Sequence, residues 1–111
     1  MKKTNITITG CMGRMGQQLI KASKKNKRFK LQSLTENRLI FKKIVGIKPQ
    51  LNSFDAFKNS DVIIDFTVPK CTLEVLKIAS KQKKRVVIGT TGFTTKEENT
   101  IKSARQELYP P

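Results

Sequence analysis

Three glycines mark the first place in the sequence where residue type and spacing suggest binding chemistry. Gly10, Gly13 and Gly16 recur at intervals of three, directly after the β-branched segment 5–9. Glycines between a strand and a helix allow a tight turn and let backbone N–H groups come close to a phosphate. The spacing is G-x-x-G-x-x-G, whereas the common dinucleotide fingerprint is G-x-G-x-x-G. Taken alone, the pattern also fits a tight turn that binds no ligand.

Two charged residues favour a phosphate ligand. Glu36 follows Gly16 by 20 residues and ends a predicted second strand, where an acidic side chain can hydrogen-bond ribose hydroxyls. Arg14 lies inside the turn, where its positive charge opposes the helix dipole unless an anion binds nearby. Ligands of open α/β sheets bind at the carboxyl ends of the strands. We therefore predict that four features share one end of the sheet: Gly10, Glu36, Thr67 and Gly89.

These residues must be positioned by alternating strands and helices. Apolar patterns predict strands over 5–9, 28–36, 61–68 and 85–91, helices over 14–25 and 70–83, and a last helix within 94–108. Segment 37–60 is predicted to hold a short strand near 44–47 and a short helix around 53–59. The alternation predicts one α/β domain over residues 1–111, with a Rossmann-like, doubly wound, mostly parallel sheet in three layers.

Two finer expectations concern the helices. Met15, Leu19 and Ala22 are spaced to form the buried face of the first helix. Thr95 and Glu98 have the spacing of a capping box at the start of the last helix.

Composition restricts the possible functions. The chain has 23 Lys and Arg against 8 Asp and Glu, a net charge of +15, which favours an anionic partner. Only one Tyr and no Trp accompany the basic residues, so the stacking surface of a single-strand binder is missing, and we predict no nucleic-acid partner. The sequence contains no histidine and two cysteines, from which we predict no metal site. Without a long apolar run or a secretory signal, it is predicted to be cytoplasmic and free of membrane spans.

Three motifs together resemble one enzyme family. "GCMGRMGQQLI", "DFTVP" and "VIGTTGF", in this order, are similar to the cofactor domain of the 4-hydroxy-tetrahydrodipicolinate (dihydrodipicolinate) reductases. The resemblance extends over about residues 4–109. It implies an NADH- or NADPH-dependent reductase of lysine and diaminopimelate biosynthesis, which reduces the cyclic product of the preceding synthase.

The resemblance also implies which residues bind the cofactor. The pyrophosphate would lie against the glycine turn, the adenosine ribose against Glu36, and the nicotinamide half along residues 89–91. The implied set is Gly10, Cys11, Met12, Gly13, Arg14, Met15, Glu36, Phe66, Thr67, Gly89, Thr90 and Thr91. Asn37, rather than a basic residue, follows Glu36, and Glu36 repels a 2′-phosphate, so NADH is favoured over NADPH.

The family's second domain has no counterpart in this sequence. That domain carries a His-His-x-x-Lys motif and a Ser-Gly-Thr loop that bind and protonate the substrate, and neither occurs here. We therefore expect a cofactor-binding domain truncated before its substrate domain, with no catalytic residue of its own and no turnover. It is expected to be monomeric, although the full-length family is tetrameric. Two alternatives stay open: a stand-alone dinucleotide-binding or redox-sensing module, and a basic nucleic-acid-binding protein.

Overall fold

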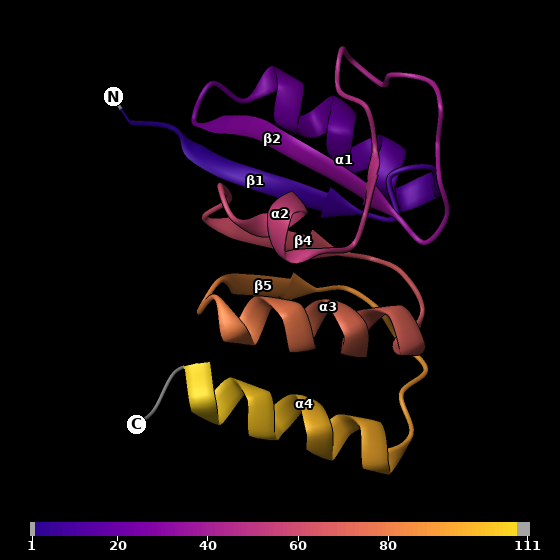
Figure 1. Ribbon diagram of the computed structural model, residues 1–111, viewed down its shortest axis with the longest axis vertical. Coiled ribbons are helices and arrows are strands. Elements are labelled where there is room, and N and C mark those ends of the chain that lie inside the picture. The colour runs from indigo at the N-terminus through magenta and orange to yellow at the C-terminus, as the bar shows by residue number, and fades with distance from the viewer. Residues whose placement is uncertain (1, 109–111) are drawn as a thin grey trace.

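The computed structural model describes residues 2–108 and contains a five-stranded sheet flanked by helices (Figure 1). The strands are β1 (Thr4–Thr9), β2 (Phe29–Glu36), β3 (Gln50–Leu51), β4 (Val62–Asp65) and β5 (Arg85–Ile88). The helices are α1 (Arg14–Lys25), α2 (Phe54–Phe57), α3 (Pro69–Lys81) and α4 (Thr95–Leu108). The strand order is β3-β2-β1-β4-β5, and all neighbouring strands are parallel. This confirms the predicted Rossmann-like α/β fold.

Each face of the sheet has its own hydrophobic core. Ile6 and Ile8 of β1 pack with Ile20 of α1 on one face. On the other face, Phe57 of α2 and Ile63 of β4 pack with residues of α3. The helix α4 lies along α3 (Figure 1). Because side chains alternate along a strand, β1 directs Thr7 and Thr9 toward the α2–α3 face, where both are fully buried.

A β-bulge in β2 explains an irregular core pattern. Ile6 pairs with Leu31, but the next residue, Thr7, pairs with Ser33, so one residue of β2 is unpaired. Leu31 and Leu34 consequently pack against the same core, although three positions separate them.

The strand predicted near residues 44–47 is wrong. Ile44 and Ile47 instead pair across a tight turn, in which Val45 and Gly46 have φ values of 46° and 82°. Glycine adopts this left-handed geometry without strain, so an apolar run that looks like a strand closes on itself. The strand of this segment is β3, whose two residues, Gln50 and Leu51, are exposed and too few to form a periodic pattern. The short helix predicted around 53–59 is confirmed as α2.

Two local predictions are off by one residue. In α1 the buried residues are Gly16, Ile20 and Ser23. Of the predicted residues, Leu19 is half-buried and packs against the core, whereas Met15 and Ala22 are exposed. The close approach of Gly16 to the preceding turn sets this rotation of the helix. The capping box of α4 is formed by Thr94 and Glu97, not by Thr95 and Glu98. The Thr94 N–H donates to Glu97 Oε1 at 2.8 Å, and the Glu97 N–H donates to Thr94 Oγ1 at 3.2 Å.

Two predicted strands end earlier than expected. β4 ends at Asp65 and β5 at Ile88, so residues 66–68 and 89–91 belong to loops at the carboxyl end of the sheet. Among residues 2–108, the structure contains no helix with the length and apolar character needed to cross a membrane.

Candidate functional site

The turn after β1 keeps side chains away from its backbone. Gly10 has a φ of 62°, and a Cβ there would lie 2.7 Å from Thr67 Cγ2. A Cβ on Gly16 would lie 2.2 Å from the Gly10 carbonyl oxygen, so this glycine lets α1 pack against the turn. A Cβ on Gly13 would meet only that same oxygen, at 3.3 Å. The fold itself therefore requires the first and third glycines, whereas the second leaves backbone open toward a cavity that it lines.

The N-terminus of α1 is suited to an anion. Gly13 is its N-cap, no side chain caps the helix, and its first turn contains no acidic residue. The first N–H groups of a helix have no partner within the helix, and the helix dipole gives them partial positive charge. Arg14 begins the helix with an exposed side chain. The described part of the chain places no acceptor side chain at these N–H groups, and a bound phosphate could accept hydrogen bonds from them.

Glu36 contacts the glycine turn directly. Its Oε2 accepts a hydrogen bond from the Met12 N–H at 3.0 Å, and its Oε1 accepts one from the Asn37 N–H at 3.0 Å. A carboxylate oxygen has two lone pairs, so each oxygen can accept a further hydroxyl donor. Glu36 thus orders the turn and keeps acceptor capacity for a diol.

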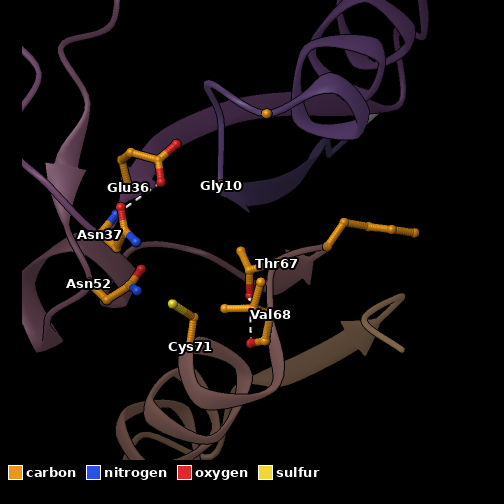
Figure 2. Close-up of a pocket in the computed structure, with 9 residues that line it drawn as sticks. Gly10, Glu36, Asn37, Asn52, Thr67, Val68 and Cys71 are labelled. Carbon is orange, nitrogen blue, oxygen red and sulfur yellow. Dashed lines mark hydrogen bonds between the residues drawn. The ribbon is translucent and has the colours of Figure 1, made fainter. Parts of the chain in front are cut away.

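An open cavity of about 270 Å³ lies at the carboxyl end of the sheet, and we call it the crevice. Figure 2 shows Glu36 and Asn37 on one side of it and Thr67, Val68 and Cys71 on the other. The residues that line it are Gly10, Gly13, Glu36, Asn37, Asn52, Phe66, Thr67, Val68 and Cys71. The first three of the four features predicted to share one end of the sheet therefore meet in one cavity.

The loops after β4 and β5 are fastened to each other beside the crevice. The Thr67 N–H donates to Thr90 Oγ1 at 2.9 Å, and the Gly89 N–H donates to the Asp65 carbonyl at 2.8 Å. The Phe66 ring lies against Gly89, where a Cβ would come within 1.9 Å of Phe66 Cε1. Packing against Phe66 therefore requires glycine at position 89, whether or not a ligand also contacts it.

Several predicted residues do not line the crevice. Cys11 is fully buried, and its N–H donates to the Thr35 carbonyl at 3.2 Å. Burial, with the Glu36 carboxylate as a second cause, raises the pKa of the Cys11 thiol from 9.0 to about 11. The side chains of Arg14, Met15 and Thr91 are exposed next to the crevice or its loops. Met12, Gly89 and Thr90 contact crevice residues without lining the cavity.

Four crevice residues and one buried carboxylate were not among the predicted site residues. Asn37 was considered only as the residue that follows Glu36. Asn52 follows the two-residue strand β3, which no pattern revealed, and its Oδ1 is buried without a hydrogen-bond partner among the described residues. Val68 and Cys71 belong to the start of α3, and only their position after a predicted strand could have indicated them. Asp65 is fully buried at the end of β4 among threonine hydroxyls.

The arrangement is suited to binding rather than to proton transfer. Glycine backbone, a helix N-terminus and a carboxylate can hold a phosphorylated diol, and the space left by Gly13 admits it. Among the side chains that the structure describes, those of residues 2–104, no three from His, Cys, Asp or Glu lie close enough together to hold a metal ion. A glycine-turn crevice at the carboxyl end of a Rossmann-like sheet defines the class of dinucleotide-binding domains.

Comparison with known proteins identifies the family. The family model for the N-terminus of dihydrodipicolinate reductase matches residues 4–110, so the chain belongs to this family as its N-terminal, dinucleotide-binding domain. The 4-hydroxy-tetrahydrodipicolinate reductase of Pelagibacter ubique (strain HTCC1062) is 70% identical over 102 residues, which are 92% of this chain and 40% of that protein. The reductase of Buchnera aphidicola subsp. Acyrthosiphon pisum (strain Tuc7) is 44% identical over 121 residues, with 96% of this chain and 44% of that protein covered. The chain thus spans about two fifths of these relatives.

Solved structures agree on the fold. Dipicolinate-bound dihydrodipicolinate reductase from Paenisporosarcina sp. TG-14 matches 96% of this chain and 44% of its own, with a TM-score of 0.77 and 22% identity. Aspartate semialdehyde dehydrogenase with NADP from Candida albicans matches 81% of this chain and 30% of its own, with a TM-score of 0.67 and 15% identity.

Proposed function

We propose that this chain binds NADH or NADPH, with NADH favoured, as the cofactor domain of a 4-hydroxy-tetrahydrodipicolinate reductase. The observation that carries the proposal is the contact between Glu36 and the Met12 N–H, since it brings a ribose-binding carboxylate onto a phosphate-binding turn. The name of the relatives, 4-hydroxy-tetrahydrodipicolinate reductase, supports the reductase reaction, and its place in lysine and diaminopimelate biosynthesis follows from that name.

Each part of the cofactor has candidate partners in the crevice. Gly10, Gly13 and the first N–H groups of α1 would hold the pyrophosphate, and Arg14 would add charge. Glu36 would accept the adenosine ribose hydroxyls. The nicotinamide half would lie toward the loops that follow β4 and β5. These two loops contact each other where the Phe66 ring packs against Gly89. The bound cofactor would supply the hydride, while these residues would hold and orient it.

The complete reaction needs groups that this chain does not offer. The sequence has no histidine, and the polar residues beside the proposed nicotinamide position are threonines, which do not donate protons to substrate at neutral pH. Hydride transfer also needs substrate and cofactor held together from both sides. We therefore propose that residues 1–111 bind the cofactor and that a substrate domain with the proton donor completes the enzyme. The cytoplasmic location and the monomeric state of the chain stay predictions.

A calorimetric titration with NADH, NADPH and duplex DNA tests the proposal. We expect NADH to bind with a dissociation constant in the micromolar range or weaker, about −8 kcal/mol at best. The reason is that the proposed substrate domain would form the other half of the cofactor-binding surface. DNA binding would be distinguished by a steep loss of affinity with salt. Absence of NADH and NADPH binding by the folded chain would contradict the proposal, and salt-sensitive DNA binding would favour the nucleic-acid alternative.

A further inference from the structure

The carboxylate of Asp65 is enclosed where the crevice loops leave the sheet. Asp65 is the last residue of β4, and its side chain is fully buried. Its partners are threonine hydroxyls: Thr9 at 2.5 Å and Thr67 at 2.8 Å on Oδ1, and Thr72 together with Thr90 at 3.3 Å on Oδ2. Among the side chains of residues 2–104, no lysine or arginine forms an ion pair with it. Threonine hydroxyls therefore supply the side-chain hydrogen bonds to this buried carboxylate.

Four threonine hydroxyls surround the two oxygens of the carboxylate. A carboxylate accepts about four hydrogen bonds, and a threonine hydroxyl donates one. Thr72 belongs to the first turns of α3, so the carboxylate also lies near the positive end of that helix dipole. A buried carboxylate that accepts several hydrogen bonds orients the hydroxyls that donate to it.

The hydroxyls belong to the segments that form the crevice. Thr9 immediately precedes the glycine turn, and the Thr67 methyl group lies where a Gly10 Cβ would be. Thr90 Oγ1 accepts the Thr67 N–H at 2.9 Å and lies 2.8 Å from Thr72 Oγ1. One carboxylate thus fastens the loops after β1, β4 and β5 to each other.

A second buried hydroxyl cluster shows that this arrangement is specific to the crevice. Thr7 lies two residues before Thr9 on the same face of β1 and is equally buried. It bonds Ser33 at 2.6 Å and also Ser60, and Ser33 donates to the Ala56 carbonyl at 2.7 Å. This cluster joins the interior of the sheet to α2 and contains no carboxylate and no crevice residue. It provides a matched control.

We propose that Asp65 is a positioning residue of the cofactor crevice, whose carboxylate holds Thr67 and Thr90 in the places that the dinucleotide requires. The inference rests on the proposed function of the crevice. Asp65 is itself fully buried and does not touch the cofactor; it acts through the threonines.

The test compares variants of the two clusters in the whole 111-residue chain. Asp65→Asn replaces two acceptor positions by donors, so it should raise the NADH dissociation constant about tenfold, the effect of losing one charge-assisted hydrogen bond. Thr72→Val should weaken NADH binding about threefold or more, and Thr72→Ser, which keeps the hydroxyl, should restore it. Thr7→Val removes a buried hydroxyl elsewhere and should leave NADH affinity within about twofold of wild type, whatever its melting temperature.

Amide hydrogen exchange gives a readout that does not depend on ligand. The Thr67 N–H should be protected in wild type and exchange faster in Thr72→Val, while the Met12 N–H, held by Glu36, should be unaffected. If Asp65→Asn does not fold, the Thr72 pair decides the question.

Two results would overturn the inference while leaving the proposed function intact. One is unchanged NADH affinity in folded Asp65→Asn or Thr72→Val. The other is a loss of affinity in Thr7→Val as large as in the Asp65 cluster. If wild type binds neither NADH nor NADPH, the proposed function itself fails, and the inference fails with it.

Discussion

The two ends of the sheet both carry cavities, but only one of them has the parts of a phosphate site. The cavity at the amino end, about 390 Å³, is larger than the crevice and is lined by Lys83, Lys84 and Arg85 among others. It has no glycine in its lining and lies beyond the C-terminus of α3. The crevice is lined by Gly10 and Gly13, next to the N-terminus of α1.

The comparison of the two cavities shows that a cluster of basic side chains does not identify the phosphate site in this protein. Basic residues occur in the last turns of α1 and α3, where they complement the negative ends of the helix dipoles. The same dipoles have their positive ends at the crevice, which therefore attracts an anion with few basic side chains of its own. The +15 net charge adds long-range attraction at most.

The largest expected effect comes from adding a side chain at Gly13. Gly13→Val should weaken NADH binding about a hundredfold or more, because a branched side chain would occupy the space next to the pyrophosphate. The substitution is tolerable for the fold, since a Cβ meets only the Gly10 carbonyl oxygen, at 3.3 Å, and φ is −74°. Ala22→Val, at an exposed position of the same helix, is the control for calorimetric titration. Equal affinities in the two variants would contradict the assignment of the turn.

A smaller effect is expected from neutralising Glu36. Glu36→Gln keeps an oxygen that can accept the Met12 N–H but removes the charge that repels a 2′-phosphate. The ratio of NADPH to NADH affinity should rise about tenfold in parallel titrations. Glu74→Gln, an exposed carboxylate on α3, should leave the ratio unchanged. If the ratio does not move in Glu36→Gln, another residue binds the ribose.

Much of the carboxyl end of the sheet could be predicted from the sequence, because its sequence patterns involve residues that are close together in the chain. The glycine turn and Glu36 combine fixed spacing with strand and helix periodicity, and both lie at the crevice. β3 could not be predicted, because its two residues are exposed and its pairing with β2 is made by backbone alone. Asn52 was missed together with β3 for the same reason.

The threonine cluster around Asp65 illustrates a second kind of limit on sequence reasoning. Its members come from β1, β4, α3 and the loops after β4 and β5, which approach only in the folded chain. Single threonines carry no periodic signal. The one-residue shift in α1 has a similar origin, since close packing at Gly16, rather than the apolar pattern, sets the rotation of the helix.

The buried thiol in the glycine turn gives a pH-dependent test of its packing. The pKa of Cys11 is raised to about 11, so between 9.0 and that value the native state keeps a proton that the unfolded chain has lost. The free energy of unfolding should therefore fall as pH rises through this range. Cys11→Ala removes this contribution, so urea unfolding from about pH 8 to about pH 11 should show a smaller loss of the free energy of unfolding in the variant than in wild type. Parallel losses would mean that the thiol is not buried.

The smallest effect is expected at the amino end. The double variant Lys83→Ala, Arg85→Ala should change the NADH dissociation constant by less than about threefold at physiological salt, where long-range attraction is largely screened. A loss comparable to that of Gly13→Val would show that the basic cavity, not the crevice, binds the dinucleotide.

The most direct test of the central claim is an NMR titration of the ¹⁵N-labelled chain with NADH. The account predicts that the amide resonances of Gly10, Met12, Gly13 and Thr67 move as NADH is added, while those of Lys83, Lys84 and Arg85 stay in place. Saturating shifts confined to the amino end of the sheet, or no shifts at millimolar NADH, would contradict it.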